Sequence, residues 1–203
     1  MPEFSNIQTY VLVKGCNYQE ELNKYYSILE NIGVGTQDVR KRFNGFYWEL
    51  DDDGYVHNQI SSNFPFLIST LTPIPIRPHI PFYTTQSGIW MGLELLIETE
   101  KLQDLITRTY YQKSYILIKT LVYELHKQFQ QTGVYFTDEA QDGQDFDGIT
   151  EHDHTQLWNF DYAIIPNHLK TLYANCPATH QIKPHDKYFE AWYIGEGRWQ
   201  NER

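Results

Sequence analysis

The sequence predicts an α+β fold, in which a largely antiparallel or mixed sheet forms a two-layer sandwich with helices mainly on one of its faces. The first observation is a strand pattern in residues 88–98, where apolar side chains occupy alternate positions: Ile89, Met91, Leu93, Leu95 and Ile97. Alternate side chains of a strand point to the same face, so this strand has one continuous apolar face.

The second observation is a helix pattern, with apolar side chains every three or four positions: Ile118, Leu121, Val122, Leu125 and Phe129. This spacing places them in one stripe along a helix, and we expect the stripe to pack on the apolar face of strand 88–98. Gly133 is expected to stop the helical region before a short strand over 134–136. Short turns between about seven strands favour an antiparallel sheet.

The N-terminal part is expected to supply a strand and two helices. Residues 7–13 are rich in β-forming side chains and predict the first strand. The helix after it should end near Gly33, and its buried face should consist of Leu22, Tyr25, Tyr26 and Leu29. A short second helix should bury Val39 and Phe43, which are four residues apart.

Two segments before the central strand contain turn-forming residues and prolines. Residues 46–50 and 55–57 flank the sequence Asp-Asp-Asp-Gly at 51–54, which predicts a β-hairpin. Four prolines in residues 73–81 predict an extended segment at an edge of the sheet, with its isoleucines packed against the body. We interpret this segment as a rigid connection, and a binding groove beneath it is the alternative.

The remaining elements are predicted from apolar spacing. Residues 98–109 predict a helix with three apolar positions, Leu102, Leu105 and Ile106, out of phase with the next helix. A strand over 157–165, a short helix over 169–176 and a strand over 188–194 should follow. Trp199 indicates that the polar C-terminal tail docks on the body.

Length and composition restrict the classes of protein to which this chain can belong. A chain of 203 residues fits a single domain over 1–203. A formal charge of -10 opposes binding to nucleic acid, because that affinity depends on Lys and Arg. Cys16 and Cys176 indicate reduced, packed thiols in a cytoplasmic protein. We see neither a signal sequence nor an apolar run of about 20 residues, so a soluble protein without a membrane partner is expected.

Acidic residues and histidines concentrate in residues 138–154, after the predicted strand 134–136. The expected binding surface consists of Asp138, Glu139, Asp142, Asp145 and Asp147. A divalent-metal site is the alternative, with Asp147, Glu151, His152 and His154 as ligands. The spacing lacks both anchoring carboxylates of an EF-hand loop, and a solvated acidic loop is a further interpretation.

Two functional hypotheses follow. In the first, the chain is a non-enzymatic cytosolic binding protein of the inhibitor or immunity type, without a cofactor. Its acidic, aromatic-rich surface would meet a basic protein partner, because opposite charges steer encounter and aromatic residues anchor interfaces. In the alternative, a metal held by residues 138–154 activates water and the chain is a metal-dependent hydrolase. We find no phosphate-binding glycine loop or nucleophile elbow in the sequence.

Overall fold

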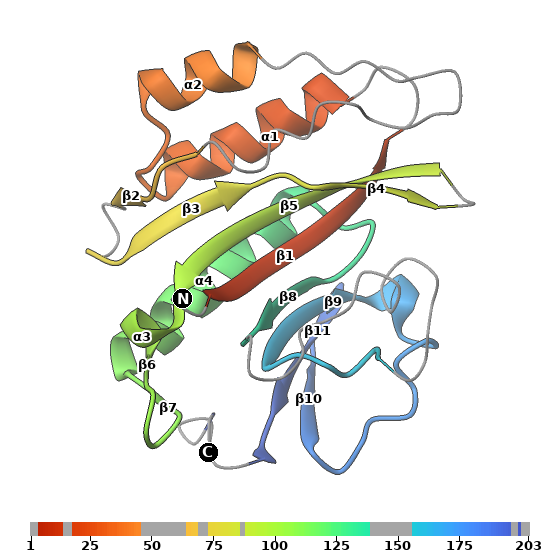
Figure 1. Cartoon of the computed structure of the whole chain (residues 1–203). Helices are drawn as coiled ribbons and strands as arrows, with labels where there is room; N and C mark the ends of the chain where they lie inside the picture. Colours follow the sequence, from red (N-terminus) through yellow and green to blue (C-terminus); the bar gives the residue numbers. More distant parts are fainter. Residues whose placement is uncertain are drawn as a thin grey trace.

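One antiparallel sheet of nine strands organises the part of the chain that the structure describes (Figure 1). The computed structural model describes residues 4–13, 18–45, 64–68, 73–85, 88–138, 156–195 and 199. The strands of this sheet are β1 (Phe4–Val13), β2 (Leu67–Ile68), β3 (Pro75–His79), β4 (Phe82–Thr85), β5 (Gly88–Glu98), β8 (Val134–Thr137), β9 (Tyr162–Pro166), β10 (His180–Pro184) and β11 (Tyr188–Tyr193). Their order is β10-β11-β9-β8-β1-β5-β3-β2, and β4 also pairs with β5.

The centre of the sheet is the pair β1 and β5. These strands pair antiparallel over their whole length, from Phe4 opposite Glu98 to Val13 opposite Ile89. On its other edge β5 pairs with β3 and then β4, while β1 pairs with β8 only over residues 6–8. The predicted strands 7–13, 88–98 and 134–136 are therefore confirmed.

Helices cover one face of the sheet, which we call the helix face. They are α1 (Tyr18–Asn31), α2 (Gln37–Asn44), the single-turn α3 (Thr99–Leu102) and α4 (Gln112–Gln128). In Figure 1, α4 lies behind β1 and β5, and α1 and α2 lie along the top. Helix α1 ends before Gly33, whose φ of 79° is the left-handed conformation that glycine tolerates at a helix end.

The predicted mutual burial of the central strand and the long helix is confirmed. Alternate β5 residues and the apolar stripe of α4 belong to one buried cluster, and Ile89 packs at its margin, half-buried. The side chains with no exposed surface include Met91, Leu93, Leu95, Ile97, Ile118, Leu121, Val122 and Leu125. The residues predicted for the first two helices, among them Leu22, Val39 and Phe43, join the same cluster. Helix α4 ends at Gln128, earlier than the predicted stop at Gly133, because Phe129 is already extended (φ −120°).

The opposite face of the sheet, which we call the second face, carries a smaller cluster that is rich in aromatic residues. It consists of Tyr10, Trp90, Tyr135, Leu157, Phe160, Ala163, Ile165, Tyr173, Phe189 and Ala191. Tyr135 and Tyr173 join their hydroxyl groups at 2.8 Å inside it. Among the described residues, the exposed large aromatic side chains are Tyr111 and Tyr123. Much of the described aromatic content therefore fills buried clusters.

The helix predicted over 98–109 is wrong beyond its first turn. After α3 the chain forms a hairpin from β6 (Gln103–Asp104) and β7 (Thr109–Tyr110). The Asp104 carboxylate accepts hydrogen bonds at 2.9 Å from the backbone N–H groups of Ile106 and Thr107, which stabilises a turn instead of a helix. Leu105 and Ile106 are consequently exposed, at 54% and 94%.

Three further predictions need correction. Strand β9 begins at Tyr162, and residues 156–158 form a turn although Leu157 is buried. The helix predicted over 169–176 is only a 3-10 turn, Asn167–Leu169, and Cys176 is exposed, not packed. Cys16 and the hairpin predicted over 46–57 lie outside the described residues.

The proline-rich segment and the tail follow the predictions more closely. Residues 73–81 are extended and bury Ile74, Ile76 and Ile80, but β3 is not the last strand, because β2 pairs with its first half. Trp199 is buried, as predicted, and its ring lies 4.9 Å from that of Tyr115. No helix in the described part of the chain has the length and apolar character needed to cross a membrane.

Candidate functional site

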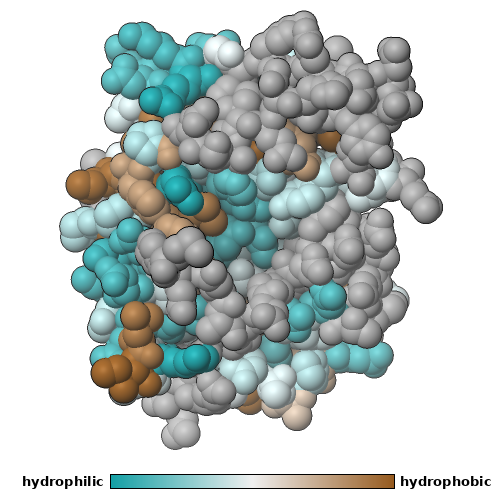
Figure 2. Space-filling view, in the orientation of Figure 1, coloured by the Kyte–Doolittle hydropathy of each residue, from teal (hydrophilic) through white to brown (hydrophobic). Residues whose placement is uncertain are grey.

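Polar residues of three neighbouring strands meet in one row on the second face. Gln8 of β1 and His79 of β3 are both direct partners of Glu94 in β5. Side chains directly opposite each other in paired strands are close enough to interact. The sheet therefore brings together three polar residues that are far apart in the sequence. Figure 2 shows a hydrophilic area in the middle of this face.

The Glu94 carboxylate is the centre of the row. Its side chain is only 5% exposed, and its Oε2 lies 2.7 Å from Nδ1 of His79, whose side chain is 27% exposed. A buried carboxylate is costly unless it is paired, so this contact offsets part of the cost of burying Glu94. The Glu94–His79 pair in turn fixes the orientation of the imidazole and leaves Nε2 as its second polar atom.

Hydrogen bonds extend the row along β1. The Tyr10 hydroxyl donates to Gln8 Oε1 at 2.8 Å and lies 3.5 Å from Glu94 Oε1. Asn6 donates from Nδ2 to the same Gln8 oxygen at 3.1 Å. Gly92 makes room for this arrangement, because a Cβ there would lie 2.6 Å from Cγ of Pro81 and 3.2 Å from Glu94 Oε1.

The next row of the same face contains a cation against aromatic rings. Arg77 lies two residues before His79 in β3, so both side chains point to the second face. The guanidinium carbon of Arg77 is 5.1 Å from the ring centre of Phe4 and 5.0 Å from that of Phe66. The two rings also stack on each other at 5.9 Å. We call Gln8, Tyr10, Arg77, His79 and Glu94 the polar strip.

The polar strip can hold and orient groups that form hydrogen bonds. It offers a carboxylate, an imidazole, an amide, a phenol and a guanidinium, all on strands of one sheet. Within the described residues, no serine, threonine or cysteine is hydrogen-bonded to His79, so His79 has no adjacent nucleophile to activate there. The groups of the polar strip are therefore suited to recognising a ligand through hydrogen bonds.

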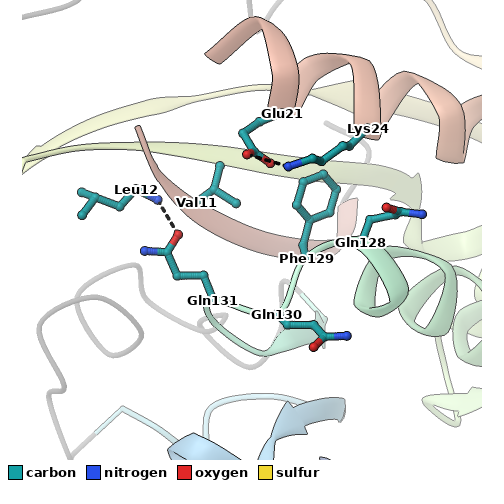
Figure 3. A pocket seen from close by; sticks show the side chains of 8 residues that line it. All are labelled: Val11, Leu12, Glu21, Lys24, Gln128, Phe129, Gln130 and Gln131. Carbon is teal, nitrogen blue, oxygen red and sulfur yellow. Dashed lines mark hydrogen bonds and ion pairs between the residues drawn. The ribbon is translucent and has the colours of Figure 1, made fainter. Parts of the chain in front are cut away.

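A separate pocket of about 390 Å³ lies at the other end of β1 (Figure 3). Phe129 points into it below the Lys24 and Glu21 side chains of α1, which are paired at 2.9 Å. Because β1 extends beyond β8 here, the side chain of Gln131 accepts a hydrogen bond from the Leu12 N–H at 3.0 Å. Three of the polar residues that line the pocket, Glu21, Lys24 and Gln131, thus already have partners.

A second pocket of about 610 Å³ lies between α4 and the β10–β11 hairpin. The Tyr188 ring stands between two histidines, 5.0 Å from the ring of His126 and 4.5 Å from that of His185. His185 Nε2 lies 2.6 Å from the Glu190 carboxylate, which also accepts from the Tyr162 hydroxyl at 2.9 Å. Burial lowers the pKa of His126 and raises that of Tyr162.

The acidic residues predicted from the sequence fall mostly outside the described part of the chain. Asp138 is described: it has no exposed surface, and its Oδ2 accepts a hydrogen bond from Gln103 Nε2 at 2.9 Å. The other predicted residues lie outside the described residues: Glu139, Asp142, Asp145, Asp147, Glu151, His152 and His154. Among the residues that are described, no group of three acidic, histidine or cysteine side chains is arranged to hold a metal ion.

Sequence reasoning did not find the polar strip. One signal was present, since Gln8 and Glu94 interrupt strands whose other face is apolar. Residues 73–81, beneath which a binding groove was the alternative interpretation, include β3, and β3 forms one side of the strip. The decisive information is strand register, since only pairing shows that Gln8, His79 and Glu94 meet. Comparison of the chain with protein-family models, with curated proteins and with solved structures gives no match.

Proposed function

We propose that this chain is a non-enzymatic cytosolic binding protein whose acidic segment, residues 138–153, meets a basic partner protein. The observation that carries the proposal is charge: the chain has 26 acidic against 16 basic residues, and the acidic residues concentrate in this segment. Opposite charge steers two proteins together and raises the rate of association. The inhibitor or immunity type of protein is the class that fits this charge.

The ends of the acidic segment support this role. Asp138 is buried at the end of β8, and Leu157 is buried just after the segment. The backbone N–H of Asp161 donates to the carbonyl oxygen of Phe136 at 2.9 Å, which ties the two flanking chains together. The residues on both sides of the segment are therefore held against the sheet. Because Asp138 is one of these buried residues, the partner would contact the residues after it.

The test uses a partner protein isolated by its binding to this chain. It measures the rate at which the two proteins associate at increasing salt concentrations. If complementary charge drives the encounter, association should slow steeply as salt rises above about 0.1 M, while dissociation changes little. The triple variant Asp142→Asn, Asp145→Asn, Asp147→Asn should slow association in the same way at low salt.

A control with the same loss of charge is available on α1 and α2. Glu20→Gln, Glu30→Gln and Asp38→Asn remove three carboxylates whose side chains are 69%, 45% and 89% exposed. The control variant should associate with the partner almost as fast as the unchanged chain does. Equal rates for the two triple variants would show that only total charge matters, and the acidic segment would then not be the docking surface.

A further inference from the structure

We infer that Arg77, with the rings of Phe4 and Phe66, forms a binding site for a carboxylate group attached to an apolar body. The inference is independent of the proposed function, because it concerns another surface and a ligand of the opposite charge. Arg77 is distinguished among the described cations by lying over two aromatic rings, whereas Arg40, Lys113, Lys119 and Lys127 each lie over one.

In the described part of the chain, Arg77 differs from several other cations in having no carboxylate nearby. Lys24, Arg40, Lys41, Lys101 and Lys127 each lie within 3.9 Å of a carboxylate. Within the described residues, by contrast, Arg77 has no carboxylate in ion-pair range, and its guanidinium lies against two phenyl rings. Its Nε is buried without a hydrogen-bond partner there, so a ligand would bind through the terminal nitrogens.

The rings hold the guanidinium in place for an anion. A cation over an aromatic face is stabilised by the ring quadrupole, and stacking restricts a side chain that is otherwise flexible. A planar guanidinium held in this way presents parallel N–H donors, which match the two oxygens of a carboxylate. Arg77 is thus prepared for an anionic group before that group arrives.

The neighbouring charges favour a single negative charge on the ligand. Arg77 contributes one positive charge, while the buried Glu94 carboxylate lies in the adjacent row, paired with His79. A doubly charged phosphate would meet this carboxylate and a chain with a net charge of -10. A carboxylate carries half that charge and has the planar shape that fits the guanidinium.

The rings of Phe4 and Phe66 indicate that the ligand also has an apolar part. Phe4 and Phe66 stack at 5.9 Å and are both half-buried, and Leu96, the β5 partner of Arg77, is half-buried as well. Figure 2 shows hydrophobic and strongly hydrophilic side chains next to each other on the side where β2 and β3 lie in Figure 1. An aromatic or aliphatic acid would cover the rings and place its carboxylate on Arg77.

The experiment titrates the full-length chain with benzoate and follows backbone and arginine Nε–H signals by NMR. Benzamide, which is neutral and has the same shape, and benzylammonium, which is positive, are the comparison probes. We expect saturable benzoate shifts at Arg77 and β3, with benzamide at least about tenfold weaker because the charge-assisted hydrogen bonds are missing. Benzylammonium should not shift these signals.

The variants are Arg77→Met and the matched control Arg40→Met. Arg40 also lies over a ring, 4.9 Å from the centre of Tyr26, but it is paired with Glu30 at 3.8 Å. Arg77→Met should weaken benzoate binding about tenfold or more, and Arg40→Met should leave it unchanged. If Arg77→Met does not fold, Arg77→Lys replaces it and should also bind more weakly, because lysine has no planar fork. Equal benzoate binding in wild type and the folded Arg77 variant, or equal shifts with benzylammonium, would overturn the inference.

Discussion

The two faces of the sheet are built from the same strands and yet differ in composition. On the helix face, alternate residues of β1 and β5 are mostly apolar, with Ser5 and Thr9 as buried polar exceptions, and they belong to one buried cluster with α1 and α4. On the second face, the half formed by β8, β9 and β11 carries aromatic and small apolar residues. The other half, formed by β1, β5 and β3, carries the polar strip with the Glu94–His79 pair.

The difference shows which requirement acts on each face. Burial against helices demands only apolar side chains of suitable volume, so many sequences satisfy it. A buried carboxylate demands a partner at hydrogen-bond distance, and Glu94 has one only because the register places His79 opposite it. Proteins tolerate such costs where they serve recognition or chemistry, so the second face is the more informative one for function.

The largest loss of stability is expected for substitutions on the helix face. Leu121→Ala and Leu125→Ala should each lower the free energy of unfolding by about 2 to 5 kcal/mol, the range for truncating a large aliphatic residue in a core. Denaturant unfolding measures this, with Ile116→Ala as the control, because Ile116 lies on the same helix and is 64% exposed. Losses below about 0.5 kcal/mol at both leucines would mean that α4 does not form the core.

The next effect tests the polar half of the second face. Glu94→Ala should cost about 1 to 3 kcal/mol, because it leaves the half-buried His79 without its partner. His79→Ala should cost a similar amount, since the buried Glu94 carboxyl group would then lose its partner at 2.7 Å. The double variant should cost clearly less than the sum of the two single ones. Strict additivity would show that the two side chains do not interact, despite their distance of 2.7 Å.

A smaller effect tests the aromatic half. Tyr135→Phe removes a hydroxyl that contacts the Tyr173 hydroxyl at 2.8 Å and accepts from the Gly133 N–H at 3.2 Å. The expected cost is about 1 to 2 kcal/mol, because both partners remain buried. Tyr123→Phe serves as the control, since Tyr123 is 45% exposed. If the two substitutions cost the same, hydrogen bonding adds nothing to the stability of this half.

The smallest expected effect is a change in how stability depends on pH. Burial lowers the pKa of His126, at the helix face, below its ordinary value of about 6.5. As pH falls below that value the unfolded chain takes up the proton first, so the folded state loses stability. His126→Phe should therefore reduce the stability lost between pH 7.5 and 5.5, with the remainder partly due to His180, whose pKa is also lowered by burial. An identical loss in the variant would mean that His126 titrates equally in both states.

Local sequence patterns were enough to predict the α+β class, the central strand, the long helix and their mutual burial. These depend on local periodicity, because alternate or three-to-four spacing decides which side chains share a face. The sequence also indicated the docked Trp199 and the buried isoleucines of residues 73–81. It was wrong for residues 103–109, where the Asp104 side chain competes for backbone hydrogen bonds and favours a turn.

Which polar residues meet depends on how distant strands pair. Gln8, His79 and Glu94 are separated by 71 and 15 positions, and nothing in local spacing relates them. A shift of one residue in the register of β3 or β1 would send their side chains to opposite faces. Arg77 likewise reaches Phe4 and Phe66 from a different strand. Local pattern fixes which faces are apolar, whereas recognition depends on register, which long-range strand pairing sets.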